Sequence, residues 1–309
     1  MPDPIVEVSL YADQVIPAHL LTASEPWVAR GFTKRWPLTS AAAKSTHSAL
    51  NYLESFYDGM MVRAIVAEAR HMARFFYNED MTGFNFYTIE TTLQRFFHQL
   101  IKYENDPKAP AIYVGSVDIA KLLPGMSTDN TLATELHEPT VSLWIGNRSR
   151  VSAHFDLPRN IACCVAGKRR FTLLPPDQAK NLYVGPWDIT PAGQPISLVD
   201  FVKPDYARFP NFRDAERNML TVDLDVGDAV YIPSLWWHHV QGLSSINGLI
   251  NFWWHESNND EVSLINTLKS TSQLMESLPE DQRKAMKALF DCYVFSEDAE
   301  PVMLMKNRT

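Results

Sequence analysis

The sequence predicts a mainly β protein, a sandwich or barrel, with helices and strands before the β-rich region and helices after it. Between Ala111 and about Glu256, short β-rich runs alternate with turn signals, and many short strands at this spacing are typical of a sandwich or barrel. The residues on either side instead show apolar side chains at helical spacing. We therefore expect an N-terminal elaboration packed on the barrel (1–108), a β core (109–256) and C-terminal helices (257–309).

The composition is that of a globular protein with an acidic balance. Apolar residues make up 46% and charged residues 21%, and 28 Lys plus Arg against 36 Asp plus Glu give a formal charge of −8. This charge argues against a broad electrostatic contact with nucleic acid. No apolar run approaches the ~18 residues that span a bilayer, and no secretory signal opens the sequence, so we expect no membrane and a cytoplasmic location. Three cysteines without a CxxC fit a reducing compartment.

The N-terminal part is predicted to mix short strands with helices. The segment Val28–Pro37 begins as a strand and breaks at Pro37. The segment Glu90–Tyr103 is predicted as a helix packed on a core, because five apolar side chains fall at helical spacing. These side chains are Leu93, Phe96, Phe97, Leu100 and Ile101.

The β-rich region has one long interruption. Its strand candidates are AIYVGSV, TVSLWIG, IACCVAG, RFTLLPP, LTVDL, AVYIP and LINFWW. The proline-bearing, aromatic stretch from Val184 to Arg217 interrupts the series, and a long insertion inside a compact barrel is more often functional than idle. After Glu256, Met286, Leu289, Phe290 and Tyr293 fall at helical spacing. This helical tail is expected to pack on the barrel or to form a homodimer.

One short motif places two candidate metal ligands on the same side of a strand. In His154-Phe155-Asp156, the first and third residues are two apart, and residues i and i+2 of a strand point to the same side. The imidazole and the carboxylate therefore project into one space, and Phe155 faces the other way. An HxD motif alone is a weak signal, because chance often produces it.

A further histidine pair follows the run GDAVYIP, in the segment SLWWHHV. If this segment is a strand, one face carries Trp236, His238 and Val240, and the other carries Trp237, His239 and Gln241. The apolar members mark the even positions as inward. His238 is therefore preferred to His239 as a third ligand.

Two histidines and one carboxylate on facing strands form the facial triad of non-haem Fe(II) oxygenases. The sequence thus predicts a metal site at His154, Asp156 and His238, with three coordination positions left for a co-substrate and oxygen. The alternative is that these are hydrogen-bonded polar residues of the core. The other six histidines are interpreted as surface or core residues: His19, His47, His71, His98, His137 and His255.

Several longer segments, in the same order, resemble the cupin-like JmjC hydroxylases, a family that includes an asparaginyl hydroxylase and a tRNA wybutosine hydroxylase. These segments are HFDLPRNIACCVAGKRRFTLLPPDQAKNLY, VDFVKPDYARFPNF, GDAVYIPSLWWHHV and NFWW, with RGFTKRWP and RFFYNEDMTGFNF upstream. The resemblance covers Glu25 to Glu256. It implies a double-stranded β-helix, or jelly-roll, that holds Fe(II) and 2-oxoglutarate.

The resemblance also implies roles for individual residues. The iron ligands are then His154, Asp156 and His238, and Asn160 and Asn251 line the co-substrate pocket. Tyr113, on the strand before the barrel core, matches a tyrosine that contacts the co-substrate carboxylate.

The family usually binds the far carboxylate of 2-oxoglutarate with a lysine, and here the matching position is Arg169. Phe171 and Leu173 are apolar and inward, so Arg169 shares their face, whereas Lys168 and Arg170 alternate outward. Arginine can bind a carboxylate through two parallel hydrogen bonds. Lys168 would replace it if the strand slips by one residue.

Two further positions differ from the family pattern. The family often has threonine three residues before the first histidine, where this sequence has Val151. The segment Pro195-Ile196-Ser197 stands where the asparaginyl hydroxylase carries polar residues that contact its substrate. The substrate is therefore expected to differ from that of the asparaginyl hydroxylase.

The expected function is a 2-oxoglutarate-dependent dioxygenase that hydroxylates a protein or peptide side chain. The same chemistry on a tRNA or a small metabolite is an alternative, and the acidic charge weighs modestly against tRNA. Demethylation of methyl-lysine ranks below these. An alternative of another class is a cupin-type module that binds a metal or a sugar without turnover.

Overall fold

The computed structural model describes residues 4–136, 139–255 and 261–295; His137 lies outside them. The chain divides into two compact units, residues 1–256 and 257–309. The segment 1–108 belongs to the same compact unit as the β-rich core.

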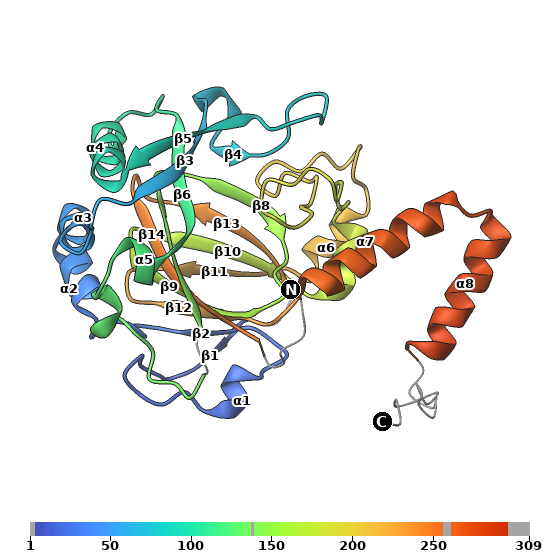
Figure 1. Ribbon diagram of the computed structural model, residues 1–309, viewed down its shortest axis with the longest axis horizontal. Coiled ribbons are helices and arrows are strands. Elements are labelled where there is room, and N and C mark those ends of the chain that lie inside the picture. The colour runs from blue at the N-terminus through green and yellow to red at the C-terminus, as the bar shows by residue number, and fades with distance from the viewer. Residues whose placement is uncertain (1–3, 137–138, 256–260, 296–309) are drawn as a thin grey trace, which may run out of the picture. The chain divides into compact units, whose positions relative to one another are not determined.

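Eight strands form a double-stranded β-helix, which confirms the predicted jelly-roll (Figure 1). The strands alternate between two facing sheets except at β10 and β11, which are neighbours in one sheet: β7, β9, β12 and β14 lie in one sheet, and β8, β10, β11 and β13 in the other. Their bounds are β7 Thr140–Gly146, β8 Arg150–His154, β9 Arg159–Ala166, β10 Arg169–Leu174, β11 Leu220–Leu224, β12 Ala229–Ile232, β13 Trp237–Gly242 and β14 Asn247–Trp254.

Six strands that precede β7 in the sequence extend these sheets at their edges. The larger sheet has the order β1-β2-β12-β9-β14-β7-β6-β3-β5, and the smaller has β11-β10-β13-β8-β4. The added strands are β1 Val6–Glu7, β2 Trp27–Ala29, β3 Met61–Ala67, β4 Arg74–Phe75, β5 Phe86–Thr92 and β6 Ala111–Asp118. The N-terminal part thus contributes strands directly to the barrel sheets.

Strand β9 shows how the core is divided between two apolar layers. Its odd residues, such as Ile161 and Cys163, pack with helices on the outer face of the larger sheet. Ala162 and Cys164 instead pack between the two sheets. A strand covered on both faces reads as a continuous apolar run, as IACCVA does. Burial raises the pKa of both cysteine thiols, and neither forms a disulfide.

Helices cover the outer face of the larger sheet. The bounds in the first unit are α1 Ala18–Leu21, α2 Pro37–Lys44, α3 Thr46–Glu54, α4 Leu93–Tyr103, α5 Ile119–Leu122 and α6 Phe212–Glu216, with short 3₁₀ helices at Ala69–His71, Met126–Thr128 and Pro176–Asn181. Leu38, Leu50 and Phe97, from α2, α3 and α4, are fully buried in the same cluster as Ile161. This layer holds the larger sheet in place behind the barrel interior.

Two predicted boundaries in the N-terminal part differ from the structure. The predicted helix at Glu90–Tyr103 starts only at Leu93, because the Thr92 hydroxyl accepts a hydrogen bond from the Arg95 N–H and caps the helix. Ile101 is 39% exposed rather than part of the apolar face. The strand predicted from Val28 is the short β2, and Pro37 opens α2, where its missing N–H costs nothing.

The long insertion connects β10 to β11. A 3₁₀ helix precedes it, and it carries helix α6 and an isolated bridge between Val184 and Ser197. Part of it runs beside the smaller sheet, since the Ser197 N–H donates to the Ala153 carbonyl at 2.7 Å. This contact brings the insertion to the open end of the barrel strands that carry the candidate ligands.

The second unit contains α7 Glu261–Ser277 and α8 Glu280–Tyr293, in agreement with the predicted C-terminal helices. No described side chain of α8 is buried. In the described ranges, no helix combines the length and apolar character needed to cross a membrane.

Candidate metal centre

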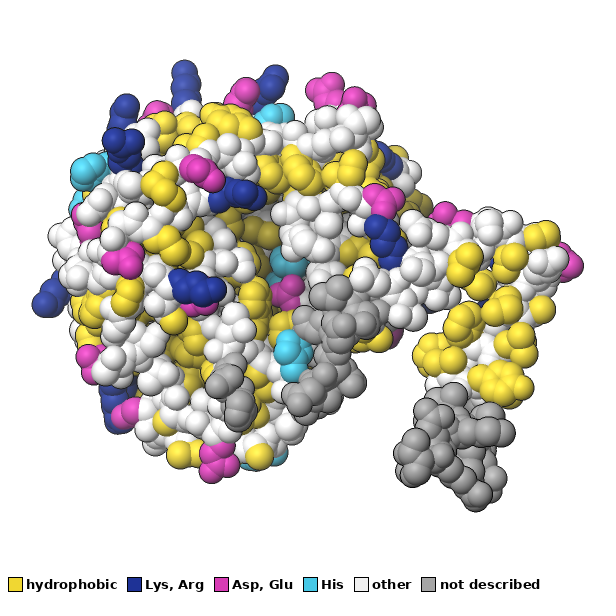
Figure 2. Space-filling model, viewed as in Figure 1, with side chains coloured by type: hydrophobic (Ala, Val, Ile, Leu, Met, Phe, Trp, Pro, Cys, Tyr) yellow, Lys and Arg dark blue, Asp and Glu magenta, His cyan; other side chains and the backbone are white. Residues whose placement is uncertain are grey.

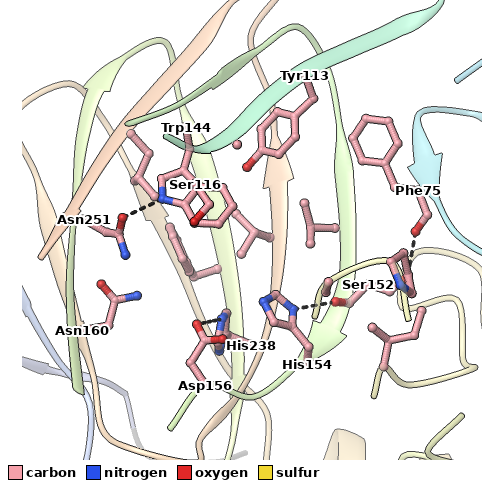
Figure 3. A pocket seen from close by; sticks show the side chains of 18 of the residues that line it. Phe75, Tyr113, Ser116, Trp144, Ser152, His154, Asp156, Asn160, His238 and Asn251 are labelled. Carbon is pink, nitrogen blue, oxygen red and sulfur yellow. Dashed lines mark hydrogen bonds and ion pairs between the residues drawn. The ribbon is translucent and has the colours of Figure 1, made fainter. Parts of the chain in front are cut away.

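A cavity of about 290 Å³ lies between the two barrel sheets and contains the three predicted ligands. Figure 3 shows His154, Asp156 and His238 gathered at one end, with Tyr113 and Trp144 at the other. Trp237 and His239 do not line this cavity, and His239 stacks on Phe201 with ring centroids 5.1 Å apart. The structure therefore places His238 rather than His239 on the cavity side.

The strand register brings the two histidines together. His154 ends β8, and its Cα partner on β13 is His238, so their ring centroids are 4.3 Å apart. Asp156 lies two residues past β8, and its Oδ2 is 3.4 Å from His238 Nε2. One potential ligand atom from each residue lies within 4.8 Å of the others, the only such group of three found in the described part of the chain.

Both imidazoles are oriented by the same kind of hydrogen bond. Nδ1 of His154 lies 2.9 Å from the Ser152 carbonyl oxygen, and Nδ1 of His238 lies 3.0 Å from the Trp236 carbonyl oxygen. When Nδ1 donates to a carbonyl, Nε2 keeps a free lone pair, which is the usual arrangement behind metal-binding histidines. The two Nε2 atoms are thus available to a metal ion.

The protonation states also suit a divalent cation. Burial and, to a smaller extent, the neighbouring His238 together lower the pKa of His154 to about 4. Burial by itself would raise the pKa of Asp156, but its hydrogen bond and charge interactions with the two histidines lower it below the usual value. Neutral imidazole with carboxylate is the donor set that Fe(II) accepts, and metal ligands must be deprotonated to bind.

At the other end of the cavity, Arg169 is a buried cation with an incomplete set of partners. It is 2% exposed, its terminal NH₂ donates to the Trp144 carbonyl at 3.2 Å, and its Nε has no partner. No acidic side chain in the described ranges pairs with it. A buried charge needs a counter-charge, so this end of the cavity fits an anion. Burial raises the pKa of the adjacent Tyr113 hydroxyl, and Arg169 opposes that shift.

The neighbouring basic residues point away from the cavity. Lys168 forms an ion pair with Asp225 at 3.2 Å, and Arg170 pairs with Asp223 at 2.7 Å. Neither lines the cavity. The alternation expected for β10 is thus present, with Arg169 and Phe171 inward.

Two asparagines on the larger sheet carry unpaired polar atoms. Asn251 Oδ1 accepts a hydrogen bond from Trp144 Nε1 at 2.6 Å, but its Nδ2 has no partner. Asn160 Oδ1 is also buried and unpaired, and both residues line the cavity. Figure 3 shows them on the same side of it. Buried polar atoms of this kind usually have a partner, so they fit a polar ligand that spans the cavity.

Several lining residues were not predicted from the sequence. Trp144 contacts both Asn251 and Arg169, yet it lies in an ordinary apolar strand run. Gly115 and Ser116 form a bulge where the β6–β7 register shifts, and Ser116 has φ +54°. Their only signal was a glycine inside the strand candidate AIYVGSV, which indicates a bulge or a close backbone approach.

The insertion closes part of the cavity, as Pro191, Ala192 and Ile196 line it. It is anchored by Asp200, whose carboxylate accepts hydrogen bonds from Arg150 at 2.9 and 3.2 Å. Ile196, from the segment that differs from the asparaginyl hydroxylase, is part of the cavity wall.

The chain is similar to known proteins over its first compact unit. A family model described as a cupin-like domain matches residues 13–260. HSPB1-associated protein 1 of Bos taurus is 35% identical over 116 residues, which are 36% of this chain and 23% of that protein. Lysine-specific demethylase JMJ31 of Arabidopsis thaliana is 29% identical over 119 residues, 38% of this chain and 21% of that protein.

A third relative matches more of the chain. The tRNA wybutosine-synthesizing protein 5 of Danio rerio is 30% identical over 162 residues, 48% of this chain and 44% of that protein. The matches thus span less than half the length of each of these three relatives. The predicted resemblance to cupin-like proteins is confirmed, and the relatives' names differ in the substrates they imply.

Proposed function

The chain belongs to the cupin-like domain family, and we propose from this membership that it is an Fe(II)- and 2-oxoglutarate-dependent oxygenase that hydroxylates a protein or peptide side chain. One observation carries the proposal. A cluster of two imidazoles and a carboxylate shares a cavity with a buried arginine that has no acidic partner among the described residues. A divalent cation and a dicarboxylate together satisfy both groups.

In this proposal, His154, Asp156 and His238 would hold the iron. Three ligands of this type leave three positions open. With iron and 2-oxoglutarate bound, the site supplies oxygen activation coupled to decarboxylation of the co-substrate to succinate and carbon dioxide. The protein binds and orients the reactants and excludes water, since the cavity lies between two packed sheets.

Arg169 binds the far carboxylate of 2-oxoglutarate in this arrangement. Its planar guanidinium offers parallel hydrogen bonds to a carboxylate, and Tyr113 lies beside it on the cavity wall. Between Arg169 and the three metal ligands, Asn160 offers an unpaired acceptor and Asn251 an unpaired donor. Lys168 is the less favoured alternative, because its ammonium group is paired with Asp225 outside the cavity.

The competing function is a module that binds a metal or another ligand without turnover. Anaerobic addition of Fe(II) and 2-oxoglutarate separates the two. An oxygenase gives a weak visible metal-to-ligand charge-transfer band, and air then produces succinate. A missing band at saturating concentrations would support the binding module.

The substrate class is part of the proposal. The relatives include a protein named as a lysine demethylase and one named in tRNA wybutosine synthesis, so a tRNA or a small metabolite is the alternative substrate. Succinate formation with peptide, tRNA and metabolite pools distinguishes them. A stimulation confined to the tRNA pool would overturn the peptide assignment.

We also propose that the C-terminal helices form a homodimer. Leu264, Leu268 and Leu274 of α7 and Leu289 and Tyr293 of α8 are between 48% and 64% exposed. Apolar helix faces of this kind are typical of an interface with another helix. The molecular mass in solution should rise with concentration for the full chain, and a chain that ends at residue 258 should stay monomeric. A full chain that stays monomeric at high concentration contradicts the dimer.

A further inference from the structure

The edge of the larger sheet offers a second binding surface, which the proposed function does not use. Strand β5 is the last strand in the order of that sheet, and β3 is its only partner among the described strands. Figure 1 shows β5 at the upper margin of the sheet, beside α4. Backbone N–H and C=O groups along its free edge can therefore pair with another extended chain.

Strand β5 lacks the features that usually protect an edge strand from such pairing. It is seven residues long, and its sequence FYTIETT contains no proline or lysine. Its register with β3 has no shift that would mark a bulge. Tyr87 and Ile89 are 56% and 45% exposed on one face, and the one charged residue, Glu90, lies on the other. Natural edge strands are commonly short, bulged or marked by such residues, so this edge fits a binding role.

The face of β5 that carries Tyr87 and Ile89 also forms part of a groove of about 530 Å³ beside α4. The groove has an apolar floor that includes Val66 of β3. Ile65, the preceding residue, instead lines the cavity that holds the candidate metal ligands. Successive residues of a strand point to opposite faces, so the groove and the cavity lie on opposite faces of β3. A ligand in the groove therefore leaves the cavity open.

The charge in the groove is positive. Arg95 and His98 of α4 line it, and none of its described lining residues is acidic. Both side chains are exposed, and neither has an ion-pair partner among the described residues. Figure 2 shows basic and histidine side chains on the surface over α4, at the upper left. Because the whole chain has a formal charge of −8, this is a local basic site that favours an acidic ligand.

We propose that β5 and the groove beside α4 bind an extended, acidic peptide segment of a partner protein by β-strand addition. The main chain of the segment pairs with the free edge of β5. Every second side chain then lies on the groove face. There, apolar side chains pack beside Tyr87 and Ile89, and an acidic side chain reaches Arg95. The site is separate from the metal ligands, so its test does not depend on the proposed function.

The test compares two peptides of matched length and strand propensity. The acidic probe is acetyl-Glu-Thr-Val-Thr-Val-Thr-Glu-amide, and the basic probe has lysine in place of both glutamates. Each probe places its valines and its charged residues on the same face of a strand, whichever direction it pairs in. A fluorescent label in place of the acetyl group reports binding to the full chain by anisotropy.

We expect the acidic probe to bind at least about tenfold more tightly than the basic probe. A unit charge about 4 Å away changes affinity by about fivefold in a solvated setting, and attraction by Arg95 becomes repulsion when lysine replaces glutamate. The difference should shrink as the salt concentration rises. Equal affinity of the two probes, or no binding of either, overturns the inference. Tighter binding of a short oligothymidylate than of the acidic probe assigns the groove to nucleic acid and also overturns it.

Two matched pairs of variants locate the binding. Ile89→Glu adds a carboxylate to the groove face, and Thr88→Glu adds the same charge to an exposed position on the other face of β5. We expect the acidic probe to bind at least about tenfold more weakly to the first and less than about threefold more weakly to the second. Arg95→Gln should lower the preference for the acidic probe by about fivefold. Lys102→Gln removes a charge from the same helix outside the groove and should leave the preference unchanged. An equal effect within either pair contradicts the proposal.

Light scattering on the full chain tests the remaining occupant, a second copy paired through β5. We expect the same mass for Ile89→Glu, Thr88→Glu and the unsubstituted chain at each concentration. A lower mass in Ile89→Glu alone would show that β5 binds another copy of this chain, which overturns the assignment to a partner peptide.

Discussion

His154 and His238 lie directly opposite each other on β8 and β13, and each ring is held by the carbonyl two residues earlier in its own chain segment. The ring centroids are 4.3 Å apart, and the two hydrogen bonds to Nδ1 hold the rings in this alignment. Such preorganisation reduces the cost of binding, because the side chains are already ordered. The site is therefore expected to bind a divalent cation without rearrangement of the barrel.

Removing two of the candidate ligands should abolish metal binding but leave the fold intact. In the double variant His154→Ala and Asp156→Ala, affinity for Fe(II) or Mn(II) should fall by at least about 100-fold. Losing only a hydrogen-bond partner of a metal ligand already lowers metal affinity by about 10- to 100-fold. Metal titration by calorimetry measures the loss, and circular dichroism checks the fold. His98→Ala, at an exposed histidine, is the control. Metal binding or succinate formation at an undiminished level in the double variant contradicts the ligand assignment.

Arg169→Ala should weaken 2-oxoglutarate binding strongly. Hydrogen bonds to charged groups are each worth about 1.5–3 kcal/mol, so affinity should fall by about 10- to 100-fold or more. Anaerobic titration of the Fe(II)-loaded enzyme measures the change. Lys168→Ala is the matched control, because its side chain lies outside the cavity. The opposite result, a loss in Lys168→Ala and none in Arg169→Ala, would assign the carboxylate to Lys168.

Local alternation in the sequence was enough to place several site residues on the cavity side. Arg169 was expected inward because Phe171 and Leu173 flank it at strand spacing, and the structure places it on the cavity wall. His238 was preferred to His239 by the same argument. The strand candidates were also enough to predict the fold class, since each run is short and bounded by turns.

The remaining contacts depend on pairings between distant parts of the chain. Trp144 meets Asn251 across two neighbouring strands, 107 positions apart, and nothing in its own segment indicates this. Arg150 and Asp200 are 50 positions apart. The bulge at Ser116 depends on a register shift against β7. Such contacts are set by register and tertiary packing, which a periodicity argument does not contain.

Gly115→Ala should destabilise the fold near the cavity. An added Cβ would lie 2.9 Å from both a Trp144 ring carbon and a Tyr113 ring carbon, closer than such atoms normally approach. One ring must move, and overpacking of this kind costs about 1–3 kcal/mol. Urea unfolding measures the free energy, and the tryptophan fluorescence of the folded state reports a shift of Trp144. Unchanged stability together with an unchanged spectrum would show that the rings have room that the contacts do not indicate.

Asp200→Asn should lower stability at neutral pH, and the effect should fade in acid. Burial alone would raise the pKa of Asp200, but hydrogen bonds from the Val202 N–H and the charges of Arg150 and Arg74 lower it. The folded-state pKa is thus below the unfolded value of about 3.9. The carboxylate therefore stabilises the fold above that value, and this contribution is lost as the pH falls through the lower folded-state pKa.

At pH 7 the variant should lose about 2–4 kcal/mol of unfolding free energy, because Arg150 remains largely buried without its carboxylate. Urea unfolding at pH 7 and at about pH 3.5 gives the two differences, and the second should be clearly smaller. Asp214→Asn breaks an exposed pair with Arg217 in the same insertion and should cost no more than about 1 kcal/mol. A deficit in Asp200→Asn that stays constant across this range would show that the residue stabilises the insertion by packing and hydrogen bonds rather than by its charge.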